Sequence, residues 1–107
     1  LPGLSLPLQQ KEVKNNYAYF PIVVWEKEFG KTRDIVFEAL AKENIYSRKY
    51  FYPLTNTYDC FEGQFDVKST PTAVHISQRV LTLPMYADLT ENQVDKICEL
   101  IRKQARC

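Results

Sequence analysis

The 107-residue sequence has few of the residues that build several kinds of functional site. It contains only three glycines, Gly3, Gly30 and Gly63, which excludes a glycine-rich loop that cradles a phosphate. Its single histidine, His75, argues against a dedicated zinc site and against a nucleophilic triad. No apolar run approaches the roughly 20 residues of a membrane-spanning helix. The sequence therefore predicts no catalytic residue, no metal ligand and no membrane partner.

The sequence also lacks an excess of charge of either sign. The chain has fourteen Lys and Arg residues and thirteen Asp and Glu residues, and the two signs are interspersed along the sequence. A nucleic-acid partner would need clustered positive charge, so we expect none. The three cysteines are odd in number and form no CxxC pattern, which favours a reducing, cytoplasmic location. We expect Cys98 to act as a small core residue on a helix, with Cys60 in a loop and Cys107 in the tail.

The length and composition fit one compact domain. Hydrophobic residues make up 45% of the chain, with seven Tyr, six Phe and one Trp. A chain of this size buries about 65% of its unfolded surface. The chain begins Leu1-Pro2-Gly3-Leu4, without an initiator Met or a signal-peptide pattern. We therefore expect a segment of a longer protein, in which residues 1–16 lead in from upstream without a core-forming pattern.

The first half of the chain predicts a strand, a helix and a second strand. Residues 17–25 are aromatic and β-branched, although Pro21 removes one ladder hydrogen bond. Thr32 is placed to cap a helix over 32–43, and Asn44 suits the left-handed position after it, with Ile45 folding back. Residues 45–53 mix β-branched and aromatic residues and predict a short strand.

The second half predicts a long loop, two helices and a third strand. Residues 54–69 show no sustained period, and so long a loop is typically functional or mobile. Thr70-Pro71 opens a short helix to about residue 79, and residues 80–85 form an apolar strand. Thr90 and Gln93 form a capping box, with Leu89 and Val94 spaced as a hydrophobic staple. The buried stripe of this last helix is expected to contain Val94, Ile97, Cys98, Ile101 and Ala105.

This order of elements predicts the α/β (α+β) class, with a small three-stranded sheet and helices packed on one face. His75 is interpreted as a partly exposed helix residue. The i, i+4 carboxylate pairs are interpreted as solvated helix faces; they are Asp34 with Glu38 and Asp95 with Glu99.

One segment has the residues of a binding edge. Arg48 can form two hydrogen bonds with a phosphate or carboxylate, while Tyr50 and Tyr52 can stack and donate, which suits an anionic ligand that contains a ring. The same run is also typical of an ordinary amphipathic strand whose cations extend into solvent. The residues alone leave both interpretations open.

Three motifs in order resemble the C-terminal domain of the DegT/DnrJ/StrS family of nucleotide-sugar aminotransferases. They are Asn16 to Ile22, Arg48 to Leu54 reading RKYFYPL, and Arg79 to Thr90 reading RVLTLPMYADLT. The resemblance implies the small domain of a fold-type-I enzyme that uses pyridoxal phosphate (PLP). Residues 17–107 would be that C-terminal small domain, and residues 1–16 would connect it to a missing N-terminal large domain.

The resemblance also implies a reaction and a division of labour. The parent enzyme would be a homodimer that transfers an amino group from glutamate to a nucleotide-linked keto sugar, here a 4-keto-6-deoxy sugar. The cofactor lysine would lie in the large domain, so this segment would hold no cofactor and be inactive alone. The substrate-binding residues would be Arg48, Tyr50, Tyr52 and Thr55. Many members have a His where this chain has Thr55.

Two alternatives remain at this stage. The chain could be a free-standing binding or regulatory module that reuses the fold without catalysis, or an unrelated small α/β protein. The sequence upstream of such a segment would distinguish them, because a large-domain pattern with its lysine motif is expected only in an aminotransferase.

Overall fold

The computed structural model describes residues 1–105 and contains a three-stranded antiparallel sheet in the order β1-β2-β3. The strands are β1 (Leu4–Ser5), β2 (Phe20–Val24) and β3 (Val80–Leu83). The central strand β2 pairs Ile22 with Leu81 of β3, while its end pairs Val24 with Leu4 of β1. This architecture confirms the predicted α+β class and the predicted size of the sheet.

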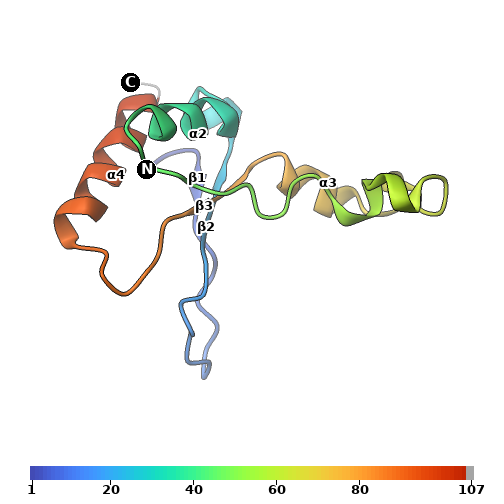
Figure 1. The fold of residues 1–107 in the computed structure, drawn as a ribbon, viewed down its shortest axis with the longest axis horizontal. Coiled ribbons are helices and arrows are strands. Elements are labelled where there is room, and N and C mark those ends of the chain that lie inside the picture. The colour runs from blue at the N-terminus through green and yellow to red at the C-terminus, as the bar shows by residue number, and fades with distance from the viewer. Residues whose placement is uncertain (106–107) are drawn as a thin grey trace.

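Helices α2 (Arg33–Lys42) and α4 (Glu91–Gln104) lie on the same side of the sheet, whereas α3 (Pro71–Ser77) lies beyond its edge (Figure 1). The core forms between the two long helices and the sheet. Its buried side chains are Ile22, Val24, Phe29, Val36, Leu40, Leu81, Ile97 and Ile101. Burial of apolar surface on this one face is the main term that holds the helices to the sheet.

The capping signals are mostly confirmed. The Thr32 side chain accepts a hydrogen bond from the amide of Ile35, and Asn44 has a left-handed φ of 59°. Thr90 and Gln93 form the expected capping box at the start of α4. Pro71 is the first residue of α3, but the Thr70 side chain forms no cap hydrogen bond. Local side-chain chemistry therefore sets the helix boundaries in three of the four places where it was expected to.

The third strand of the sheet is not the predicted one. Residues 45–53 form no strand, because only Arg48 pairs with the sheet, through a single antiparallel bridge to Thr82. The edge of the sheet is instead β1, from the N-terminal residues that show no periodicity. Gly3 fits beside Phe29 with a φ of 76°, where an added Cβ would clash with the Phe29 backbone nitrogen. The close approach of these two backbones places β1 against the short helix α1 (Glu26–Phe29), which the sequence pattern also does not predict.

The stripe of α4 is narrower than expected. Ile97 and Ile101 are buried, but Cys98 is exposed and Val94 is 41% exposed. Adjacent helix residues are rotated by about 100°, so Cys98 turns out of the contact that Ile97 makes with the core. The prediction of Cys98 as a core residue is therefore wrong. Cys60 is exposed in the predicted loop, and Cys107 lies outside the described residues.

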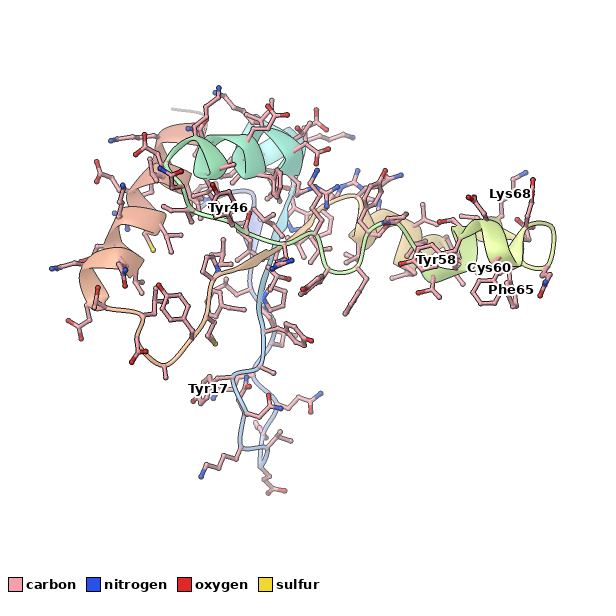
Figure 2. The ribbon with its side chains drawn as sticks, in the orientation of Figure 1. Tyr17, Tyr46, Tyr58, Cys60, Phe65 and Lys68 are labelled. Carbon is pink, nitrogen blue, oxygen red and sulfur yellow. The ribbon has the colours of Figure 1, made fainter. Side chains whose placement is uncertain are left out.

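Two segments project from this body (Figure 1). One, the arm, comprises residues 54–70 and contains three short 3-10 helices, η1 (Thr55–Thr57), η2 (Asp59–Phe61) and η3 (Val67–Ser69). The other, the N-terminal loop, comprises residues 6–19 between β1 and β2. Figure 2 shows Tyr58, Cys60, Phe65 and Lys68 on the arm and Tyr17 on the N-terminal loop. The irregular character predicted for residues 54–69 is confirmed.

Candidate functional site

A cavity of about 250 Å³ lies where the chain leaves β3. It brings together two of the predicted site residues, Arg48 and Tyr50. The rest of its wall comes from Ala18, Tyr19, Tyr46, Thr82, Leu83, Pro84, Met85 and Tyr86. Three tyrosines, Tyr19, Tyr46 and Tyr86, thus join the site from outside the predicted segment. Their contribution depends on the folded chain, and spacing within residues 47–54 carries no signal for it.

The bridge to β3 fixes the position of Arg48. Its amide donates to the Thr82 carbonyl at 2.9 Å, and the Thr82 amide donates back to the Arg48 carbonyl at 2.7 Å. Side chains alternate in extended backbone, which places Tyr46, Arg48 and Tyr50 together on the cavity side. Ser47 is buried away from that cavity, and its hydroxyl is the one buried side-chain polar atom without a hydrogen-bond partner in residues 1–105.

The cavity combines an accessible cation with aromatic walls. Arg48 is exposed, and within residues 1–105 its guanidinium forms no salt bridge. The rings of Tyr19 and Tyr50 meet edge to face at 5.7 Å. An unpaired guanidinium can form two parallel hydrogen bonds with a phosphate or carboxylate, and tyrosine rings can stack and donate. The arrangement therefore suits an anionic ligand that also has a ring.

Tyr52 and Thr55 do not line this cavity. The ring centroid of Tyr52 lies 5.1 Å from the guanidinium carbon of Arg33, on the side of the segment where Lys49 contacts α2. Thr55 is the first residue of η1, at the base of the arm. The structure thus groups two of the four predicted substrate residues and places the other two along the adjacent surface.

A buried arginine lies behind this segment. Arg33 is only 3% exposed, and its guanidinium donates to the carbonyl oxygens of Ser77 and Val80. It also donates to the carboxylate of Asp34 at 2.8 Å, and the Lys49 ammonium forms a salt bridge with the same carboxylate. Partial burial raises the pKa of Asp34, but the Lys49 hydrogen bond and the charges of Arg33 and Lys49 outweigh it and hold the pKa below 3.8. Neither the burial of Arg33 nor this cluster is predicted from the sequence.

A second groove adjoins the cavity. It has a volume of about 410 Å³ and shares the walls Tyr46, Pro84 and Tyr86 with the Arg48 cavity. Its remaining lining comes from Asn44, Ile45, Leu89, Gln93, Lys96 and Ile97. Tyr46 and Tyr86 thus separate the Arg48 cavity from the adjoining groove.

Among residues 1–105, no lysine lines the Arg48 cavity, so an aldehyde cofactor there would find no amine to bind covalently. In residues 1–105 no group of three His, Cys, Asp or Glu residues could hold a metal ion. His75 is exposed on α3, and the centroid of its ring lies 5.6 Å from the ring centroid of Trp25. None of the helices in this part of the chain is long and apolar enough to cross a bilayer.

Comparison with known proteins identifies relatives along almost the whole chain. The model of the DegT/DnrJ/EryC1/StrS aminotransferase family matches residues 1–102. A dTDP-4-amino-4,6-dideoxy-D-glucose transaminase of Escherichia coli is 39% identical over 102 residues, which are 94% of this chain and 27% of that protein. The spore coat polysaccharide biosynthesis protein SpsC of Bacillus subtilis is 30% identical over 105 residues, covering 95% and 27%. The chain thus spans about a quarter of the length of these relatives.

Solved structures reproduce the fold. DesI, crystallised in the presence of its TDP-sugar product, superimposes with a TM-score of 0.87 and 27% identity over 96% of this chain and 26% of DesI. A Bacillus cereus protein described as a PLP-dependent aminotransferase superimposes with a TM-score of 0.70 and 25% identity. The match covers 92% of this chain and 25% of the Bacillus cereus chain. With residues 1–102 matched by the family model and the fold shared with a sugar-processing relative, the chain belongs to the DegT/DnrJ/EryC1/StrS aminotransferase family.

Proposed function

We propose that this chain is the C-terminal small domain of an aminotransferase that moves an amino group from glutamate to a nucleotide-linked 4-keto-6-deoxy sugar. In this proposal the Arg48 cavity is part of the substrate wall. The observation that carries it is the exposed Arg48 guanidinium, which has no salt-bridge partner within residues 1–105 and lies in a cavity walled by four tyrosines.

The chemistry of a nucleotide sugar matches that wall. Its diphosphate is an anion that a guanidinium binds through two hydrogen bonds, and its base and sugar rings can pack against tyrosine. The relatives named as transaminases of a 4-amino-4,6-dideoxy sugar support the choice of a keto group at carbon 4. Tyr52 and Thr55 would contact the substrate from the surface beside the cavity.

The rest of the reaction would belong to the longer protein. PLP, its lysine and its phosphate ligands would lie in an N-terminal large domain. Residues 1–16 would lead from that domain into the small domain of residues 17–107 and supply the edge strand β1 of its sheet. The parent would be a cytoplasmic homodimer. The share of the relatives that this chain spans, about 27%, supports a large missing part.

The shape of the described residues fits such a setting. Their radius of gyration is 15.4 Å, against about 13 Å for a compact domain of 100 residues. The excess comes from the arm and the N-terminal loop, which expose Tyr58, Phe65 and Tyr17 (Figure 2). Exposed aromatic residues on projecting segments are typical of surfaces that another part of a protein covers. We propose that the large domain and the partner subunit cover them.

Amino transfer by the full-length protein that carries this chain tests the proposal. The protein, loaded with PLP, is incubated with glutamate and dTDP-4-keto-6-deoxyglucose, and the products are identified by mass spectrometry. The amino sugar and 2-oxoglutarate should form in equal amounts, because the amino group leaves one substrate for the other. Binding of the sugar without amination would instead support a non-catalytic module, and absence of both would contradict the proposal.

A further inference from the structure

Arg33, Asp34 and Lys49 form a cluster behind the Arg48 segment that the proposed reaction does not use directly. We infer that Arg33 and Asp34 are positioning residues, which hold residues 48–52 so that Arg48 and Tyr50 face the cavity. This inference rests on the proposed function, because it gives these residues a role in the geometry of the same site.

The inner side of the cluster is fixed to the core. The Arg33 guanidinium donates to the carbonyls of Ser77 at 3.1 Å and Val80 at 2.9 Å, which are the last residue of α3 and the first residue of β3. Its Nε donates to Asp34 at 2.8 Å. A buried charge with these three acceptors has little freedom to move, since each lost contact would leave a buried donor unsatisfied. Arg33 and Asp34 thus form a rigid anchor at the start of α2.

The outer side of the cluster holds the segment at two points. The Lys49 ammonium binds the Asp34 carboxylate and lies 4.5 Å from the ring centroid of Phe37. The Tyr52 ring lies 5.1 Å from the Arg33 guanidinium carbon, which is within the range of a cation–π contact. Residues 49 and 52 therefore turn toward α2, while residues 48 and 50 turn toward the cavity.

The segment needs this support because its backbone is weakly held. In the described part of the chain, Arg48 forms the single bridge of this segment to β3, and no longer ladder fixes the rotation of the segment. The Tyr52 amide donates to the Lys49 carbonyl and closes a turn, but this bond does not tie residues 49–52 to the sheet, so backbone bonds alone leave the turn free to rotate about the bridge. The contacts of Lys49 and Tyr52 with the Arg33 and Asp34 anchor remove that freedom, which preorganises the site before the substrate binds.

Steady-state kinetics of the full-length protein test this role, with the sugar as the variable substrate. Lys49→Gln breaks the link to Asp34 without leaving a buried charge, because Lys49 is 29% exposed. We expect the KM for the nucleotide sugar to rise about two- to fivefold, the scale of a partly exposed ion pair, with kcat and the KM for glutamate unchanged. Lys49→Arg, which keeps a cation, should restore the KM. Lys103→Gln, which breaks the exposed pair with Glu99 on α4, is the matched control and should change nothing.

A double variant separates linkage from independent effects. If Lys49 acts through Asp34, then Lys49→Gln combined with Asp34→Asn should raise the sugar KM no more than the larger single change. The positioning role would be overturned if the fold increases in the sugar KM of the two single variants multiplied in the double variant. It would also be overturned if Lys49→Gln had the same sugar KM as the control Lys103→Gln. Should Asp34→Asn fail to fold, the rise in the sugar KM for Lys49→Gln and its return for Lys49→Arg still test the positioning role. An Arg48→Ala variant run alongside distinguishes the two proposals: a raised sugar KM for Arg48→Ala without one for Lys49→Gln overturns positioning alone, whereas an unchanged KM for Arg48→Ala overturns both.

Discussion

At the scale of single residues, Asp34 shows how one carboxylate can serve two cations. It accepts from the buried Arg33 and from Lys49, yet its own side chain is 54% exposed. Burial works against its charge, and the two cations together outweigh burial and lower its pKa. Because the lowered pKa belongs to the folded state, the folded protein binds a proton at Asp34 less readily than the unfolded chain does. Stability then gains from the charged form.

Asp34→Asn should therefore lose stability in a pH-dependent way. Above about pH 4, where unfolded Asp is charged, the variant should be less stable by at most about 1 kcal/mol, because the carboxylate is half exposed. As pH falls through the lowered folded pKa, the wild-type carboxylate protonates and the difference should disappear. Urea unfolding of both proteins between about pH 2 and 7 measures it. Glu38→Gln, one turn further along α2, is the control; an Asp34 difference that does not vary with pH would contradict the assignment.

Residue types predicted part of the candidate site and left part hidden. Arg48 and Tyr50 stand out because a cation between aromatic residues has an evident binding chemistry. Arg33 has no such signal, since its partners Ser77 and Val80 lie 44 and 47 positions away. The walls Tyr19 and Tyr86 likewise join the cavity only through the pairing of strands. What a residue does here is predictable when its neighbours in sequence decide it.

At the scale of elements, the helices follow local rules and the sheet does not. The caps at Thr32 and Thr90 are decided within four residues, so the sequence predicts them. Residues 45–53 have the composition of a strand but form one bridge, whereas β1 pairs although its two residues show no pattern. Strand pairing depends on which distant backbone is available, which composition does not record.

The packing of α4 gives the sharpest test at this scale. Ile97→Ala should reduce the free energy of unfolding by about 2 to 5 kcal/mol, because it removes a buried branched side chain and leaves a cavity. Cys98→Ala, at the next residue, should change it by less than about 0.5 kcal/mol, because Cys98 is exposed. Denaturant unfolding of both variants compares them directly. Equal losses would show that the helix faces the core at a different angle.

At the scale of the whole molecule, this chain has one core, and two segments project from it. The core is closed by α2, α4 and one face of the sheet, while the arm and the N-terminal loop project with exposed aromatic residues (Figure 1). Among residues 1–105, the Arg48 guanidinium has no salt-bridge partner, and no lysine lines its cavity to supply the amine that PLP chemistry requires. The proposed function therefore assigns that amine to a part of the protein outside this chain.

The isolated chain should accordingly form no specific covalent adduct with PLP. Incubation with stoichiometric PLP followed by borohydride reduction should label its lysines weakly and without preference, as measured by peptide mass spectrometry. The full-length protein treated in parallel should be labelled at one lysine outside this chain. A single saturable lysine within residues 1–107, together with turnover of a keto sugar, would contradict this division of labour.

The most direct test of the account is the effect of Arg48→Ala on nucleotide-sugar kinetics in the full-length protein. If the Arg48 cavity is part of the substrate wall, kcat/KM for the sugar should fall by the equivalent of about 1.5 to 3 kcal/mol, the scale of a hydrogen bond to a charged group, while the absorbance of bound PLP stays unchanged. Arg102→Ala, an exposed arginine of α4, is the matched control and should leave kcat/KM as it is. Unchanged sugar kinetics for Arg48→Ala, with a stability change of only about 0 to 1 kcal/mol, would mean that Arg48 is an ordinary surface cation and would contradict the account.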